Sequence, residues 1–188
     1  MRPETRGRRL RGRGGIACLV LGFACLPAAR CQQPALSEAQ VKAAFVYNFA
    51  KFVEWPDQAH TQAEPIVVGV AGDPQLAAVV EETLRGKNVQ GRRFEVRDFP
   101  SPESLSLCHI LFVASHDKLN VQRTLHVTRN SPTLTIGEIR GFSDWGGIIE
   151  LVLEENKFRF EINAGAARRG GLKVSSRLLR LARSVKGN

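Results

Sequence analysis

The sequence lacks several features that define whole classes of protein. It contains no apolar run of about 18 residues or more, which excludes a membrane-spanning helix in the mature chain. Its four cysteines lie at positions 18, 25, 31 and 108, so only one of them falls after residue 31. A fold built on internal disulfides is therefore excluded. No Walker A, GxGxxG or GxSxG motif occurs. With 43% hydrophobic and 24% charged residues, the composition is that of a globular protein.

Positive charge is concentrated at the two ends of the chain. Residues 1–31 hold seven arginines and one acid, whereas residues 32–188 hold 20 basic and 17 acidic residues. The basic start is followed by the apolar run Gly15–Leu26 and then by Pro27-Ala28-Ala29, which is the order of a secretory signal peptide. We therefore expect export, with cleavage after Ala29 or after Cys31, and a mature domain over residues 32–188.

The second basic region lies at the C-terminal end, where no acid follows Glu161. Its basic residues are Arg168, Arg169, Lys173, Arg177, Arg180, Arg183 and Lys186. Such a run forms either a solvated helix face or a docking surface for an acidic partner or an anionic membrane surface. Much of the excess charge leaves with the signal, and basic residues are not interleaved with aromatics. We therefore expect no nucleic-acid partner.

Strand-like and helix-like segments alternate along the mature chain. A helix is predicted over 36–53, with Ser37 and Gln40 as a capping box and with Phe45, Phe49 and Phe52 in the core. Further helices are predicted over 74–84, over 118–128 and from Ser175 or Ser176, and strands over 65–71, 93–97, 110–114, 132–136, 148–153 and 158–162. This order predicts a single three-layer α/β sandwich with a mostly parallel sheet and a late antiparallel hairpin.

The residues that usually carry chemistry form no recognisable constellation. The four histidines, His60, His109, His116 and His126, have no metal-site spacing to one another or to cysteine. Ser115-His116-Asp117 holds the residue types of a triad, but three consecutive residues cannot form that relay. We therefore expect no metal, no cofactor and no enzymatic activity. Cys108 opens the apolar run 108–114, so it is either a buried small hydrophobe or half of a disulfide to Cys31 or to another chain.

The glycine-rich loop Gly137–Gly147 is the candidate binding surface. It carries Phe142 and Trp145, and exposed aromatic side chains in such loops are typical of interaction sites. The alternative is that both rings fold back into the core. Glu138, just after a predicted strand, is either a cap or a partner contact. The basic residues Arg177 and Arg180 of the last predicted helix form a secondary candidate surface.

Six blocks of the mature chain, in order, resemble the YfiR family. They are VKAAFVYNFAKFVEWP (41–56), CHILFVA (108–114), LTIGE (134–138), Phe142 with GGIIEL (146–151), FEIN (160–163) and LKVSSRLLRLA (172–182). The resemblance implies a periplasmic, often dimeric α/β protein without catalysis. Such a protein binds the periplasmic sensor region of an inner-membrane diguanylate cyclase and holds it inactive, which lowers cyclic di-GMP and biofilm formation. An OmpA-like outer-membrane lipoprotein relieves this inhibition.

One departure from the family pattern concerns cysteine. Cys108 stands where a family cysteine would, but the segment that should supply its partner reads VVGV at 67–70. The resemblance therefore does not extend to redox control through an internal disulfide. The alternative function is a periplasmic module that binds a small ligand at the ends of its strands.

Overall fold

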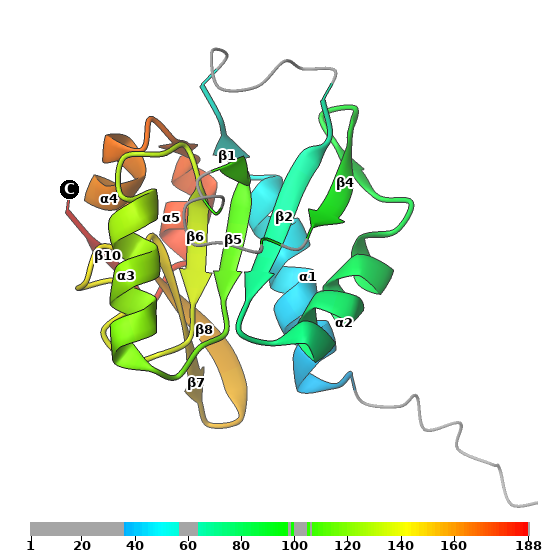
Figure 1. The fold of residues 1–188 in the computed structure, drawn as a ribbon. Coiled ribbons are helices and arrows are strands. Elements are labelled where there is room, and N and C mark those ends of the chain that lie inside the picture. Colours follow the sequence, from blue (N-terminus) through cyan, green and yellow to red (C-terminus); the bar gives the residue numbers. More distant parts are fainter. Residues whose placement is uncertain (1–35, 57–63, 98, 100–104, 106, 188) are drawn as a thin grey trace, which may run out of the picture. The chain divides into compact units, whose positions relative to one another are not determined.

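The computed structural model describes residues 36–56, 64–97, 99, 105 and 107–187 (Figure 1). The predicted signal peptide over residues 1–31 and His60 both lie outside these residues. The helices are α1 (Glu38–Ala50), α2 (Pro74–Leu84), α3 (Lys118–Thr128), α4 (Ala164–Arg169) and α5 (Ser176–Leu181). The strands are β1 (Val53–Glu54), β2 (Ile66–Ala71), β3 (Asn88–Val89), β4 (Arg92–Arg97), β5 (Ile110–Val113), β6 (Leu134–Gly137), β7 (Ile149–Glu154), β8 (Lys157–Asn163), β9 (Lys173–Val174) and β10 (Ser184–Lys186).

The main sheet of the described residues has eight strands in the order β10-β8-β7-β6-β5-β2-β4-β3. The neighbours from β7 through β6, β5 and β2 to β4 are parallel, and β10 is parallel to β8. The β7–β8 hairpin and the β3–β4 pair are antiparallel. The predicted sheet, mostly parallel with a late antiparallel hairpin, is confirmed.

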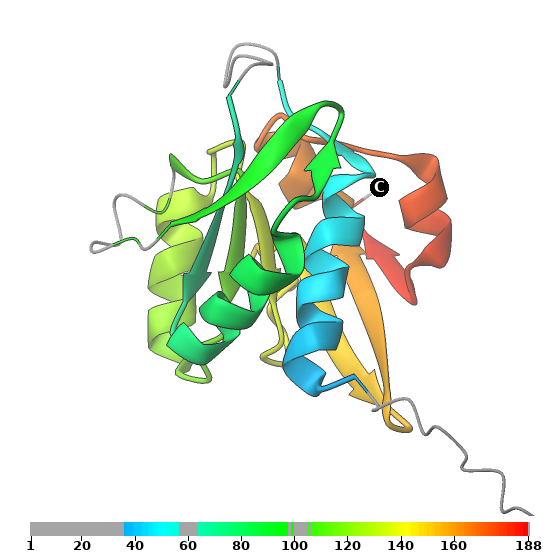
Figure 2. The same cartoon turned by 90° about the vertical axis from the view of Figure 1, so that its right-hand side faces the viewer.

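Helices cover both faces of this sheet. Figure 2 shows α1 and α2 together on one side and α3 on the opposite side. Strand β5 explains why both faces need cover, because its side chains alternate between the two cores. Ile110 and Phe112 pack in the larger cluster with α1 and α2, whereas Leu111 and Val113 pack in a smaller cluster with residues of α3. The predicted three-layer α/β sandwich is therefore confirmed.

Short-range signals placed the helix starts correctly. Ser37 and Gln40 form the predicted capping box on α1. Asp73 accepts two backbone N–H groups at the start of α2, and Ser175 caps α5. The predicted packing of the α1 aromatics is also confirmed: Phe49 is buried and its ring meets Phe160 edge-on at 5.1 Å, while Phe45 and Phe52 pack against the same cluster.

One predicted helix end was wrong and one strand was not predicted, and in both cases the segment pairs with a strand far away in the sequence. The first helix ends at Ala50 rather than residue 53, because Val53 and Glu54 pair with β9 in a separate two-stranded sheet. The last helix starts where predicted but ends at Leu181. Residues 184–186 then form β10 beside β8 and extend the main sheet past the hairpin.

Candidate partner-binding surface

One buried carboxylate holds the loop between β6 and β7, residues 138–148. Glu150 on β7 is 5% exposed. Its Oε1 accepts the backbone N–H of Gly141 at 3.0 Å, and its Oε2 accepts the N–H and the hydroxyl of Ser143 at 2.9 and 2.8 Å. Hydrogen bonds to an ionised acceptor are about twice as strong as those between neutral groups. The 138–148 loop is therefore fixed to the sheet rather than free to rearrange.

The ring of Phe142 is enclosed by two glycines, one at the end of β6 and one in the 138–148 loop. Phe142 is fully buried in the smaller core cluster. A β-carbon at Gly137 or at Gly147 would collide with its ring. The ring thus occupies the space that side chains at those two positions would fill. The expectation that Phe142 contacts a partner directly is therefore wrong, and the alternative, that it folds into the core, holds.

Trp145 remains partly at the surface of the 138–148 loop. Its ring packs against the edge of the smaller core cluster but is not buried. The ammonium group of Lys118, at the start of α3, lies 5.0 Å from the ring centroid. A cation over an indole face holds the ring through the ring quadrupole. Trp145 is thus a positioned, partly exposed aromatic side chain, as a binding surface needs.

Glu138 connects the end of β6 to α1. Its carboxylate lies 2.5 Å from the Nζ of Lys42, and both side chains are largely buried. Lys42 also pairs with Glu38 at 2.7 Å. Burial lowers the pKa of Lys42, but its hydrogen bonds to Glu138 and Glu38 outweigh that effect, so the net shift is upward. The pair gives Glu138 a role in holding α1 to the sheet, and it would have to open before Glu138 could contact a partner.

The outward side of α5 carries an exposed stripe of two arginines and a leucine. Leu178 points into the core, whereas Arg177, Arg180 and Leu181 are exposed, the leucine by 64%. Residues three and four apart share one helix face, so these three side chains lie together. Neither arginine forms an ion pair with a residue that the structure describes. We call these three residues the α5 stripe.

Other members of the C-terminal basic run are already paired. Arg183 lies 2.8 Å from Glu154. Lys186 lies 2.6 Å from Asp144 and 3.3 Å from Glu161, and the hydrogen bond to Asp144 raises the pKa of Lys186. Carboxylates at the β10 edge pair with these two cations. The basic residues of this run that pair with no described carboxylate therefore lie on α4, on β9 and in the α5 stripe.

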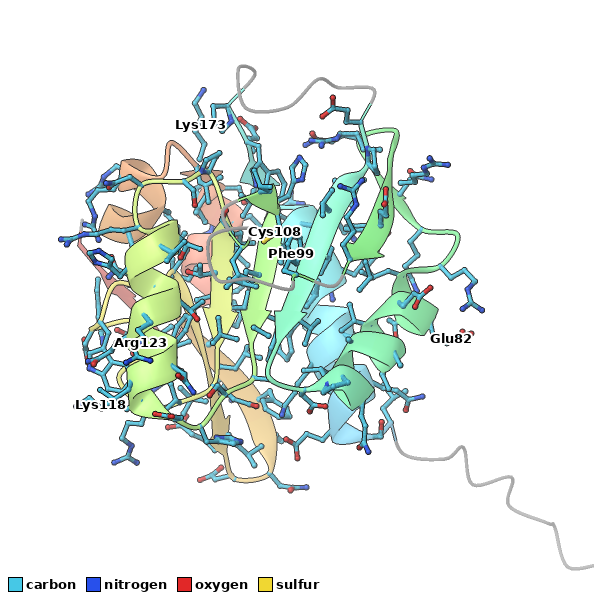
Figure 3. All side chains as sticks on the ribbon, viewed as in Figure 1. Glu82, Phe99, Cys108, Lys118, Arg123 and Lys173 are labelled. Atoms are coloured by element: carbon cyan, nitrogen blue, oxygen red, sulfur yellow. The ribbon has the colours of Figure 1, made fainter. Side chains whose placement is uncertain are left out.

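Cys108 is buried just before β5 (Figure 3). Its thiol donates to the carbonyl oxygen of Leu105 at 2.9 Å, and it is a free cysteine among the described residues. Cys31 lies outside those residues. Burial raises the pKa of the Cys108 thiol from its ordinary 9.0 to about 12. Cys108 thus has the surroundings of a packed small hydrophobe rather than of a reactive thiolate.

We expect the folded protein to protect Cys108 from alkylation. At pH 8, iodoacetamide should modify Cys108 at least about 100-fold more slowly than in the urea-unfolded chain, because the buried thiol stays protonated. The raised pKa of the thiol also makes the free energy of unfolding fall as the pH rises from 9 to about 12. Over this range the thiol ionises in the unfolded chain but stays protonated in the folded one. Mass spectrometry of the labelled peptide measures the rate. Rapid labelling of the native protein, or no free thiol after unfolding without reductant, would contradict this.

Two groups considered for chemistry have structural partners. Asp117 caps α3 by accepting the N–H of Leu119, so the 115–117 segment forms a helix start rather than a relay. His109 is buried, its Nδ1 accepts the N–H of Val67, and its carbonyl oxygen accepts the indole N–H of Trp55. The described ranges contain no group of three side chains arranged to hold a metal ion.

A sequence profile of the YfiR/HmsC-like family matches residues 39–183, which include all the described helices except the first residue of α1 and all the described strands except β10. The chain belongs to the YfiR/HmsC-like family. This family is regulatory rather than catalytic, and its members are periplasmic. No helix of the described residues is long and apolar enough to span a bilayer.

Two solved structures are similar in fold. A conserved domain protein from Vibrio cholerae O1 biovar eltor matches with a TM-score of 0.54 at 13% identity, over 80% of this chain and 61% of that one. The ABC domain from Streptococcus pneumonia, solved in complex with L-Trp, matches with a TM-score of 0.48 at 13% identity, over 78% and 60%. This YfiR/HmsC-like chain thus spans about three fifths of each solved chain, and the first likeness supports the fold alone.

Two residues that hold the candidate surface of this YfiR/HmsC-like domain in place were not predicted from the sequence. Glu150 organises the 138–148 loop, and Lys42 neutralises Glu138. A signal was present for Glu150, because a lone carboxylate in the apolar run GGIIELVL is costly to bury unless hydrogen bonds satisfy it. No comparable signal marks Lys42, whose partner lies 96 positions away.

Proposed function

We propose that the mature protein binds the periplasmic sensor region of an inner-membrane diguanylate cyclase and holds it inactive. Lower cyclic di-GMP and weaker biofilm formation would follow. Family membership over residues 39–183 is the observation that carries this proposal. We further propose, as the resemblance of the six sequence blocks implies, that the protein is a homodimer and that an OmpA-like outer-membrane lipoprotein releases the inhibition. Export by the predicted signal peptide would bring the protein to the cyclase's sensor region.

The α5 stripe and Trp145 are the residues we assign to this contact. Tryptophan and arginine are over-represented among the residues that dominate binding energy, and Leu181 adds apolar area between cations. An inhibitor works by binding the off-state of the sensor better than its on-state. A ten- to hundredfold preference needs roughly 1.4–2.7 kcal/mol, which a few such side chains supply. The two arginines, which pair with no carboxylate among the described residues, favour an acidic patch on the cyclase.

Reversing the charge of the α5 stripe should abolish the interaction. We expect Arg177→Glu with Arg180→Glu to lower the recovery of cyclase with the tagged protein by about tenfold or more, because two attractive charges become repulsive. Arg123→Glu on α3 is the matched control, since Arg123 is also exposed and lies on another element (Figure 3). The measurement is co-purification from detergent-solubilised membranes with mass spectrometry. Equal recovery of cyclase with both variants would remove α5 from the interface.

A groove at the carboxyl ends of β2 and β4 favours a second candidate function. It has a volume of about 530 Å³ and is lined by Val70, Gly72, Asp73 and Val96, among others. Open α/β sheets bind ligands outside the carboxyl ends of their strands. Because Asp73 already occupies the α2 start, the groove suits a neutral or cationic molecule. A thermal-shift screen that finds such a ligand, with Ala78→Trp blocking it, would support a ligand-binding module.

A further inference from the structure

A separate groove lies between α3, the 138–148 loop and the end of α4. Its volume is about 370 Å³, within the range of small-molecule sites. Leu125, His126 and Arg129 line it from α3, Trp145 from the loop, and Arg169 from α4. The α5 stripe is not part of it. This groove therefore differs from the surface assigned to the cyclase, except for the shared Trp145.

Two of the polar acceptors that line this groove, those of Asp144 and Asn163, are already used. Asp144 is the one acidic lining residue, and its carboxylate lies 2.6 Å from the ammonium of Lys186. The side-chain oxygen of Asn163 accepts the N–H of Ala166, and its amide nitrogen donates to the carbonyl of Ser143. A ligand that needs acceptors would therefore have to break these bonds or use only the exposed side chains of Gln122 and His126.

The donors, by contrast, are unused. Arg129, Arg169 and His126 are exposed, and none has a hydrogen bond or ion pair with the part of the chain that the structure describes. The indole N–H of Trp145 is likewise without a partner there. Because the two arginines can only donate and the one carboxylate is paired with Lys186, the groove favours a group that accepts hydrogen bonds.

Backbone packing brings together the two helix ends that carry the arginines. Arg129 is the C-cap of α3, and Arg169 is the last residue of α4. Gly170, directly after α4, approaches the carbonyl of Ser131 so closely that a β-carbon there would lie 2.6 Å from that oxygen. The two helix ends are thereby held together, and both guanidinium groups border one groove.

We propose that this groove binds a small organic oxyanion, a carboxylate or phosphate monoester carried on an apolar body. Planar guanidinium groups match the paired oxygens of such a head. Leu125 and the exposed part of the Trp145 ring supply an apolar wall for the body. The volume limits the ligand to a small molecule. This site does not depend on the proposed cyclase interaction and can be tested on the isolated protein.

The two tryptophans make nuclear magnetic resonance the direct test. In the ¹⁵N-labelled mature protein, the indole N–H signal of Trp145 reports on the groove, whereas that of Trp55, bonded to the His109 carbonyl, is an internal control. The probe is phenyl phosphate, titrated in parallel with inorganic phosphate and with phenol. We expect a saturable shift of the Trp145 signal with a dissociation constant of about 1 mM or below for phenyl phosphate. Inorganic phosphate should bind about tenfold more weakly, and phenol should not saturate.

Arginine variants inside and outside the groove separate binding in the groove from a general effect of surface charge. We expect Arg129→Gln, and independently Arg169→Gln, to weaken phenyl phosphate binding by about tenfold or more. Arg123→Gln removes the same charge from α3 outside the groove and should leave binding within about twofold. An unchanged Trp55 signal in each variant shows that the fold is intact.

Three results would overturn the proposal. The first is no saturable shift of the Trp145 signal with phenyl phosphate. The second is equal weakening by Arg123→Gln and Arg129→Gln, which would mean that phosphate only screens surface charge. The third is loss of the Trp145 signal with phosphatidylglycerol vesicles while soluble phenyl phosphate has no effect, which would make the oxyanion a lipid headgroup on a membrane surface rather than a bound small molecule.

Discussion

Replacing Phe142 with alanine lowers the free energy of unfolding by about 3–5 kcal/mol. The ring is fully buried, and the two residues that abut it at 137 and 147 are glycines, which have no side chain to move into the space. A large cavity therefore remains, and its cost adds to the lost transfer free energy of the ring. Urea denaturation of the mature protein, followed by circular dichroism, measures the change.

Trp145→Ala in the same loop is the matched control. Because that ring is only partly buried, its removal should cost less, about 1–2 kcal/mol. The two variants also separate packing from recognition: Phe142→Ala should act through stability, and Trp145→Ala through cyclase binding. A Phe142→Ala variant that is as stable as the parent but fails to bind the cyclase would place the ring at the interface and contradict the structure.

Replacing Glu150 with alanine lowers the free energy of unfolding by about 3–5 kcal/mol. Three donors, two backbone N–H groups and the Ser143 hydroxyl, lose their shared acceptor in a site that water barely reaches. Each unsatisfied donor costs about 1–3 kcal/mol. The 138–148 loop should also loosen, so the fluorescence of Trp145 should shift toward that of a solvated indole. Urea denaturation and fluorescence measure the two effects.

Glu154→Ala on the same strand gives the comparison. Glu154 is partly exposed and pairs with Arg183 at the surface, so its loss should cost about 1 kcal/mol or less. Glu150→Gln should lie between the two, because one oxygen remains but an amide N–H₂ replaces the other. A Glu150→Ala variant no less stable than Glu154→Ala would show that Glu150 does not hold the loop.

Local chemistry explains which parts of the fold were predictable. Ser37, Asp73 and Ser175 accept backbone N–H groups two or three residues ahead, so their helix starts are set by a few neighbouring residues. β10 and β1 were missed for the opposite reason. Residues 184–186 become a strand only beside β8, and residues 53–54 only beside β9, some 120 positions away. Propensity within a short segment carries no information about such partners.

The same limit applies to the candidate surface. Exposed arginines on α5 followed from charge and periodicity, and the structure places Arg177 and Arg180 as expected. The burial of the Phe142 ring could not be predicted in this way, because it depends on the free space above Gly137 and Gly147 once β6 and β7 are paired. The position of Glu138 after a predicted strand left it free, in the sequence, to contact a partner. Its ion pair with Lys42 forms only because α1 packs against this end of the sheet.

Cellular cyclic di-GMP tests the central claim most directly. The gene is deleted in the source bacterium and then restored with residues 1–31 intact, and cyclic di-GMP is quantified by mass spectrometry under several growth conditions. The proposed inhibition of a diguanylate cyclase predicts a rise on deletion and a return to the original level on restoration. An unchanged cyclic di-GMP level in the deletion strain under every condition would contradict the repressor function and favour the ligand-binding module.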